Sequence, residues 1–114
     1  MYRLLVNDKE VGINLQLADN FWRRFRGWMR YRPRNDEGLL LYPANSIHTF
    51  FMRVAIDSLF LDRDWRVIKI IENILPDRIV WPVVRARYVL ELPAGQAREK
   101  AIKYGDKISY KKEE

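Results

Sequence analysis

One stretch of the chain, residues 45–57 with the sequence NSIHTFFMRVAID, gathers the side chains best suited to chemistry. It contains His48, the only histidine among the 114 residues, together with Arg53 and Asp57. A histidine can act as a general base near neutral pH because its unperturbed pKa is about 6.5. An arginine can hold a carboxylate or a phosphate through its planar fork of N–H donors. The stretch could therefore form a reactive site, a binding surface or a core strand.

Catalysis at this stretch would require partners that the sequence does not offer. A hydrolase based on His48 and Asp57 would need a nucleophile beside the histidine. Ser46 and Thr49 are the nearest hydroxyls, and neither lies in a nucleophile-elbow sequence. A metal site would have one histidine, no cysteine and otherwise only carboxylates as ligands. We therefore predict no catalytic residue, no metal site and no cofactor, and keep a hydrolase as a third hypothesis after the two below.

Interpreted as a β-strand, the same stretch has two unlike faces, because side chains alternate along a strand. One face is apolar, begins at the histidine and comprises His48, Phe50, Met52, Val54 and Ile56. The opposite face carries Thr49, Phe51, Arg53, Ala55 and Asp57. An aromatic ring beside a cation and an anion suits a groove better than a core or a solvated surface.

The mixed face makes a non-enzymatic binding module the favoured hypothesis, with a small molecule or peptide carrying an anionic group as its ligand. The predicted ligand-binding residues are His48, Thr49, Phe51, Arg53, Asp57 and Trp81. The alternative for Arg53 and Asp57 is a structural role with other partners, because four residues of extended strand span about 13 Å.

A second segment, residues 21–34 with the sequence FWRRFRGWMRYRPR, holds six arginines and no acid. Its aromatic residues have helical spacing, which predicts a short helix that Asp19 or Asn20 caps and Gly27 ends. In the favoured interpretation, the aromatic stripe fills the core and comprises Phe21, Trp22, Phe25 and Trp28. In the alternative, the chain is a nucleic-acid-associated protein whose phosphate contacts are Arg23, Arg24, Arg26 and Arg30.

The remaining pattern predicts mostly short strands joined by turns. An N-terminal hairpin surrounds NDKE at residues 7–10, and the other expected strands cover residues 39–42, 45–62, 66–74, 88–92 and 106–111. Residues 75–87 are expected to be irregular along a sheet edge, and residues 94–105 to form a short helix. Glu91 alternates with leucines and is expected at the surface of its strand, or else opposite Arg53 across the sheet.

These elements predict a single domain over residues 1–114 of the mainly β class. The expected architecture is a small antiparallel β-sandwich or a partly closed barrel with one or two short helices. The motifs FRGWMRYR, GLLLY, SIHTFFMRVAIDSLFLD, YVLELPAG and GDKI occur in this order over about residues 10–110. In this ordered set the chain resembles the DUF192 family of small proteins. The resemblance implies an all-β-type fold with a small helical element, and it implies no activity.

The amino-acid composition limits the chemistry and the cellular location that we expect for the chain. The chain is 48% hydrophobic and 32% charged, has a net charge of +6 and has no cysteine, so disulfides and thiolate chemistry are excluded. No apolar run approaches the length of a membrane span, and the N-terminal apolar stretch is too short for a signal peptide. We therefore expect a cytoplasmic protein without membrane association, as a monomer or a weak dimer through strand edges.

Overall fold

The structure, a computed structural model, describes residues 1–113 and contains nine strands and two short helices within them. The elements in chain order are β1 (Tyr2–Val6), β2 (Lys9–Ala18), α1 (Phe21–Arg26), β3 (Glu37–Leu41), β4 (Ile47–His48), β5 (Ile56–Leu61), β6 (Val67–Ile74), β7 (Ile79–Val80), β8 (Tyr88–Pro93), α2 (Gln96–Glu99) and β9 (Ile108–Lys112). The prediction of a mainly β fold with one or two short helices is confirmed. No helix in the described part of the chain is long and apolar enough to cross a membrane.

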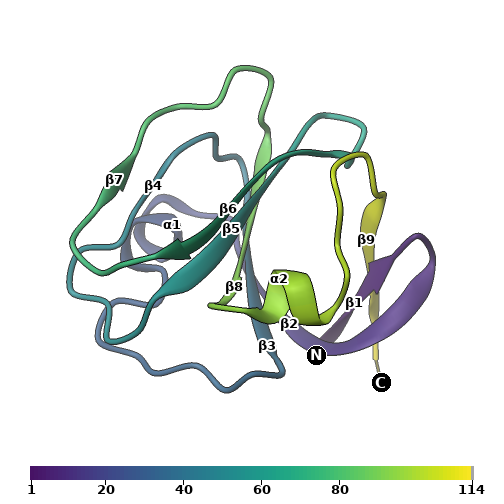
Figure 1. Ribbon diagram of the computed structural model, residues 1–114, viewed down its shortest axis with the longest axis horizontal. Helices are drawn as coiled ribbons and strands as arrows, with labels where there is room; N and C mark the ends of the chain where they lie inside the picture. Colours follow the sequence, from purple (N-terminus) through teal and green to yellow (C-terminus); the bar gives the residue numbers. More distant parts are fainter. Residues whose placement is uncertain (114) are drawn as a thin grey trace.

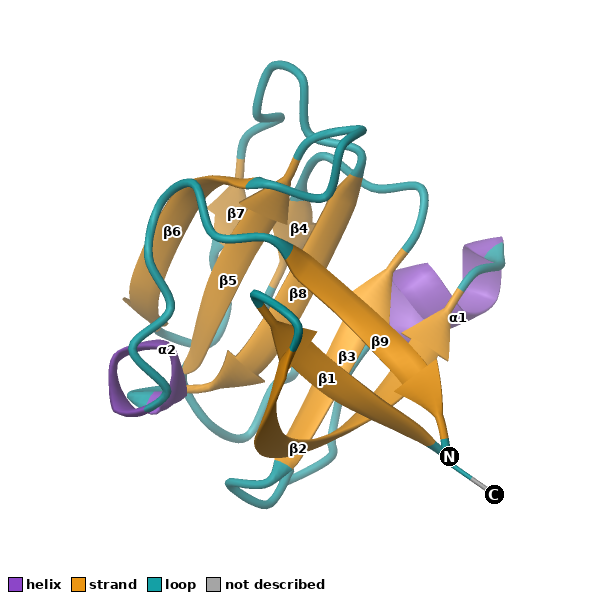
Figure 2. Ribbon diagram, turned by 90° about the vertical axis from the view of Figure 1, so that its right-hand side faces the viewer, coloured by secondary structure: helices purple, strands orange, loops and turns teal. Residues whose placement is uncertain are grey.

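Seven strands form one mixed sheet in the order β6-β5-β8-β3-β2-β1-β9, and β4 pairs with β7 in a separate small sheet. The large sheet curls strongly but does not close into a barrel, as Figure 2 shows. Its two edges meet through one isolated bridge between Arg66 and Lys107. In Figure 1, β4, β7 and α1 lie together on one side of the molecule, while β9 and both termini lie on the other.

The hairpin of β1 and β2 forms as predicted. Asn7 and Asp8 both have positive φ angles, 52° and 68°, and they make the tight turn whose twist suits a two-residue hairpin loop. Along β2, Ile13 and Leu15 are buried, and Gly12 and Gln16 are exposed. The hairpin therefore places one face of β2 in the core.

The pairing of β2 with β3 is parallel, unlike every other strand pair among the described residues. Parallel neighbours need a crossover, and residues 19–36 supply it with α1 at its start. The Asn20 side chain caps this helix by accepting a hydrogen bond from the Arg23 N–H at 2.9 Å. Gly27 ends it with a φ of 47°, so the predicted cap and end of the helix are both confirmed.

The predicted burial of the aromatic stripe is wrong for three of its four residues. Phe21, Trp22 and Phe25 are 63%, 75% and 43% exposed, and no residue of α1 is buried. Trp28 alone enters the core, where it is 3% exposed. The helix has only six residues, and the chain leaves the helical register at Gly27, so Trp28 fills the core from outside the helix.

The prediction of one strand over residues 45–62 is also wrong. Only β4 and β5 are strands there, and residues 49–55 are turns between them. The Thr49 hydroxyl donates to the carbonyl of Leu75 at 2.7 Å and accepts from the N–H of Arg78 at 2.8 Å. These bonds hold the backbone against residues 75–78 and compete with a continuous strand ladder. The alternation of two faces therefore ends after β4, and Phe50 and Phe51 are both exposed.

The central strands β3, β5 and β8 are buried on both faces and separate two hydrophobic cores. The first core lies on the side of α2 and includes Leu59, Leu90 and Leu92. The second lies under α1, β4 and β7 and includes Phe60 and Val89. A polar residue on any of these three strands therefore enters a core whichever way it points.

A pocket between α1 and the β4–β7 sheet

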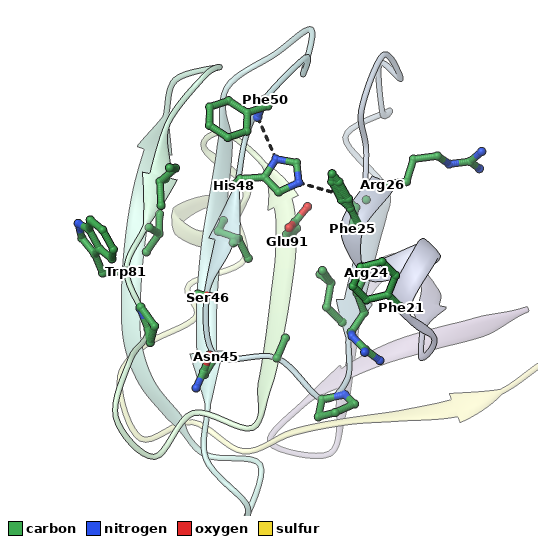
Figure 3. Close-up of a pocket in the computed structure, with 18 of the residues that line it drawn as sticks. Phe21, Arg24, Phe25, Arg26, Asn45, Ser46, His48, Phe50, Trp81 and Glu91 are labelled. Carbon is green, nitrogen blue, oxygen red and sulfur yellow. Dashed lines mark hydrogen bonds between the residues drawn. The ribbon is translucent and has the colours of Figure 1, made fainter.

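A cavity of about 580 Å³ opens over the second core, between α1 and the small β4–β7 sheet. Its inner wall is apolar and includes Leu41, Ile47 and Met52, all of them buried. Phe21, Phe25 and Phe50 contribute aromatic rings to the outer wall. Trp81 also lines the pocket, but its ring points outward in Figure 3 and is 79% exposed. Phe21 and Phe25 of α1 and Phe50 after β4 are exposed because they border this cavity and the solvent and do not enter the core.

The base of the pocket carries a carboxyl group, that of Glu91 in β8. Figure 3 shows this group pointing into the space between His48 and Phe25. Glu91 is only 1% exposed, and its Oε1 atom has no hydrogen-bond partner among the described residues. Burial raises the pKa of Glu91 to about 8, because a charged carboxylate loses its hydration in this position. The group is therefore mostly protonated at neutral pH.

The expectation that Glu91 lies at the surface is wrong. Glu91 shares its face of β8 with Val89, and that face belongs to the second core. Its neighbours across the sheet are Leu39 in β3 and Ser58 in β5, so it does not lie opposite Arg53 either. The expectation assumed that one face of the strand meets solvent, whereas β8 is a central strand covered on both faces.

Gly27 lies directly beside this carboxyl group. A Cβ atom at Gly27 would lie 3.8 Å from Oε1 of Glu91, and the φ of 47° favours glycine over residues with a side chain. The turn that ends α1 therefore passes close over the base of the pocket without a side chain to cover it.

His48 joins the two sides of the pocket. Its Nδ1 accepts a hydrogen bond from the Phe50 N–H at 3.1 Å, so Nε2 carries the proton and donates to the Phe25 carbonyl at 2.8 Å. The imidazole ring also packs between the rings of Phe25 and Phe50, with centroid distances of 5.1 and 5.2 Å. Both ring nitrogens are engaged, so His48 fixes the pocket wall and offers no free lone pair to a substrate or a metal.

Arg24 supplies a fixed cation at the rim. Its Nη1 donates to the carbonyls of Asp19 and Tyr42, each at 3.2 Å. These two bonds leave Nε and Nη2 as adjacent donors that can face an anionic group. Arg26 also lines the pocket, but its side chain extends away from Glu91 in Figure 3.

Of the six residues predicted to bind a ligand, His48 and Trp81 line the pocket. Thr49 is fully buried and binds the backbone of residues 75–78, as described above. Asp57 is also fully buried, and it accepts hydrogen bonds from the N–H groups of Asn73, Gly95 and Ala97. These contacts hold β6 and the start of α2 in place.

The other two predicted residues, Phe51 and Arg53, lie on the outside of the loop. Arg53 Nε donates to the carbonyl of Arg30 at 3.0 Å, and the Arg30 guanidinium lies 5.4 Å from the centre of the Phe51 ring. These contacts join the turn after α1 to residues 51–53. The structure thus distributes the six residues over four places, and their role in binding remains a prediction.

Three of the four arginines predicted to bind phosphate, Arg23, Arg24 and Arg30, have contacts within the protein. Arg23, Arg24 and Arg26 lie on the exposed helix α1, and Arg23 Nη1 donates to the Leu17 carbonyl at 3.3 Å. Arg30 lies beyond the helix beside Phe51. The four arginines therefore follow the outer side of the chain from α1 into the following turn.

Comparison with known proteins gives one consistent family. The DUF192 family model, described as "Uncharacterized ACR", matches residues 3–110. A UPF0127 protein of Pyrococcus horikoshii is 37% identical over 100 residues, which cover 84% of this chain and 86% of that protein. A UPF0127 protein of Pyrococcus furiosus is 33% identical over 107 residues, which cover 90% of each.

Two solved structures share the fold. A protein of unknown function from Novosphingobium aromaticivorans has a TM-score of 0.81 at 23% identity, over 95% of this chain and 82% of that chain. A candidate transcription regulator from Sinorhizobium meliloti has a TM-score of 0.79 at 26% identity, over 96% of this chain and 91% of that chain. The family model spans nearly the whole chain and the sequence relatives exceed 30% identity over most of it, so the chain belongs to the DUF192 family, whose relatives carry the name UPF0127.

Proposed function

We propose that this domain is a binding module whose pocket takes a small amphipathic molecule or a peptide segment with an anionic group. The observation that carries the proposal is the cavity of about 580 Å³, with aromatic walls and a buried carboxyl group at its base. Small-molecule sites commonly have volumes of about 300–1,000 Å³, mostly apolar walls and a few polar groups that orient the ligand. The pocket has each of these properties.

Arg24 is the residue that we assign to the anionic group of the ligand. Arg53 was the sequence-based choice, but it lies outside the pocket and donates to the Arg30 carbonyl. Arg24 lines the pocket and is held by two carbonyls, so little side-chain freedom is lost when its remaining donors bind an anion. His48 and Trp81 line the pocket, so we keep both residues as proposed neighbours of the ligand.

The experiment compares two fluorescent probes that share an apolar body and differ in one charge. 8-Anilinonaphthalene-1-sulfonate carries a sulfonate, and N-phenyl-1-naphthylamine lacks it. Both probes should bind the protein, and the sulfonate should improve the affinity by about tenfold, which corresponds to about 1.4 kcal/mol. Arg24→Gln should remove this difference. Arg23→Gln changes a matched arginine on the same helix that does not line the pocket, and it should preserve the difference.

A second pair of variants locates the probes. Phe50→Ala removes a ring from the pocket wall and should weaken both probes, whereas Phe51→Ala removes the adjacent exposed ring that lies outside it. The proposal is wrong if neither probe binds, or if the two phenylalanine variants weaken binding equally.

Nucleic-acid binding is a second candidate function, because the exposure of the α1 aromatics favours it. Phe21, Trp22 and Phe25 are accessible, and three arginines alternate with them on the same helix. Exposed rings beside cations can stack on bases while the cations bind phosphates. The candidate transcription regulator from Sinorhizobium meliloti has the same fold, which gives a further reason to test nucleic acid here.

Fluorescence anisotropy with a labelled single strand and a labelled duplex, at about 50 and about 200 mM salt, tests this candidate. Binding through α1 should weaken steeply with salt, and the double change of Arg23 and Arg26 to glutamine should reduce the salt slope by about 1.4 for the single strand and about 1.8 for the duplex. Absence of binding at the lower salt concentration rejects the candidate. The sulfonate probe should displace the labelled single strand and the labelled duplex only if the probe and the nucleic acid share Arg24.

A further inference from the structure

Two buried polar groups on one face of the central sheet have no partner, and one of them, Glu91, lines the base of the pocket. Glu91 Oε1 and the hydroxyl of Ser58 are both buried and have no hydrogen-bond partner among residues 1–113. The two residues are directly paired across β8 and β5, so their side chains lie on the same face of the sheet. Buried polar groups in folded proteins are nearly always paired. The unpaired Glu91 oxygen at the base of the cavity is therefore the group that a ligand is expected to complete.

Within residues 1–113, no cation pairs with the Glu91 carboxyl group. His48 faces it from β4, but both imidazole nitrogens are engaged by the backbone of Phe25 and Phe50. On the strands beside it, the directly paired residues are uncharged, Leu39 in β3 and Ser58 in β5. The only cause that raises the pKa of Glu91 is burial, which agrees with the absence of a nearby positive group.

The two arginines of the pocket are also directed elsewhere. Arg24 holds the carbonyls of Asp19 and Tyr42, and Arg26 extends away from the carboxyl group in Figure 3. A cationic ligand group at the base would therefore meet a single unpaired acid without a competing cation beside it. An anionic group there would meet only an acid, and its proper partner is Arg24 at the rim.

The walls above Glu91 suit a cation as well. Phe25 and the His48 ring lie next to the carboxyl group in Figure 3, Phe50 lies beyond His48, and Phe21 lines the same pocket from α1. The faces of aromatic rings attract ammonium groups, and the attraction grows when the site excludes water. A buried carboxyl group in a pocket with aromatic walls is thus complementary to an ammonium group and less so to a neutral polar group.

We propose that the pocket binds an ammonium group against Glu91, so that the ligand is a small zwitterion with its ammonium inside and its anionic group at Arg24. This inference rests on the proposed function and names the ligand class. Glu91 loses its proton to solvent as the ammonium arrives, and a carboxylate–ammonium pair remains.

Calorimetry with a matched pair of probes, 4-phenylbutylamine and 4-phenylbutan-1-ol, tests this inference. The amine should bind about tenfold more tightly than the alcohol. Each probe is titrated into the protein at pH 7 in phosphate and again in Tris. Because the two buffers differ in ionisation enthalpy, the difference in the binding heat gives the number of protons released. Because the pKa of Glu91 in the empty pocket is about 8, the amine should release close to one proton and the alcohol none.

Glu91→Gln keeps the shape of the side chain and removes its charge. This variant should bind the amine about tenfold more weakly, abolish proton release and leave the alcohol unchanged. A second measurement is independent of any variant. In the wild-type protein with ¹³C-labelled glutamate, the carboxyl signal of Glu91 should move to its ionised position when the amine is added at pH 7.

The possible failures are distinguishable. The inference is overturned if the amine binds no better than the alcohol, or if its binding releases no proton. If this occurs while the sulfonate probe still binds in a manner that depends on Phe50 and Arg24, the proposed function stands and only the ammonium assignment fails. If no probe binds, both proposals fail.

Discussion

Two carboxyl groups are buried in neighbouring strands, and the fold uses only one of them. Asp57 in β5 accepts three backbone hydrogen bonds at 2.9 to 3.0 Å. Glu91 in β8 has an unpaired Oε1 and a pKa raised to about 8 by burial. Asp57 faces the side of α2 and the first core, whereas Glu91 faces the second core and the pocket.

The difference teaches that burial alone does not mark a functional acid. Asp57 is buried as completely as Glu91, yet its oxygens accept hydrogen bonds from backbone N–H groups of β6 and of the residues at the start of α2. The Glu91 carboxyl group makes no hydrogen bond within residues 1–113, so its burial lowers the free energy of unfolding and satisfies no other group of the fold. A group of this kind is expected where a ligand completes it. Stability measurements on the two acids should therefore separate a structural role from a binding role.

The largest expected effect is a pH dependence that belongs to Glu91. The unfolded chain titrates this group near 4.5 and the folded chain near 8, so the folded state binds the proton more tightly. The contribution of this proton to the free energy of unfolding is complete below about pH 4.5. It falls by about 1.4 kcal/mol per pH unit as pH rises from 4.5 to 8, and above 8 it is lost. Urea unfolding across this range should show a total loss of about 4–5 kcal/mol from this group.

Other carboxylates also titrate in acid, so the comparison is made with Glu91→Gln at each pH. The difference in the free energy of unfolding between this variant and the wild type should change steadily between pH 4.5 and 8 and then become constant. A constant difference over that window would contradict the raised pKa.

The second effect concerns Asp57. Asp57→Ala removes the acceptor of three backbone N–H groups, which then remain unsatisfied in or near the first core. We expect a loss of about 3–4 kcal/mol in the free energy of unfolding, measured in urea. Asp57→Asn retains one acceptor oxygen and should lose less. A loss below about 1 kcal/mol in the alanine variant would mean that water replaces the carboxylate, and the structural role would be wrong.

The sequence predicted those parts of the fold that depend on neighbouring residues. The hairpin at residues 7–10, the Asn20 cap and the end of α1 at Gly27 each follow from a few adjacent side chains. The expected strand over residues 45–62 failed because Thr49 binds backbone groups of residues 75–78, more than 25 positions away. Contacts of that kind leave no periodic trace in the sequence.

The candidate site was predicted only in part. His48 and Trp81 were identified and line the pocket, but Glu91 and Arg24 were not assigned to it. A signal for Glu91 existed in the sequence YVLELP, since apolar residues occupy both the odd and the even positions of β8. Such a strand is covered on both faces, so its single acid must be buried. Arg24 could not be assigned, because its position depends on α1 lying over the second core without being buried in it.

A third effect should have the opposite sign from that of Asp57→Ala. Glu91→Met replaces the unpaired carboxyl group by an apolar side chain of similar size, so the cost of burying the acid disappears. We expect an increase of about 1–2 kcal/mol in the free energy of unfolding at pH 7, measured in urea. Leu92→Met on the opposite face of β8 is the matched control and should cost less than about 1.5 kcal/mol. Destabilisation by Glu91→Met would indicate an internal partner for the acid and would remove the contrast between the two carboxyl groups.

The smallest effect tests how closely the turn at Gly27 controls this acid. Gly27→Ala places a methyl group about 3.8 Å from Oε1 of Glu91, at a φ of 47° that disfavours a side chain. The strain should lower the free energy of unfolding by about 1 kcal/mol. The methyl group also adds an apolar atom beside the carboxyl group, which disfavours its charged form, so the pKa of Glu91 should rise further in a ¹³C titration. Gly105→Ala is the matched control, because it has a φ of 88° and no atom within 4 Å of its Cβ position. It should show a similar strain and leave the pKa of Glu91 unchanged, so an equal pKa in both variants would mean that solvent does not reach Glu91 through this turn.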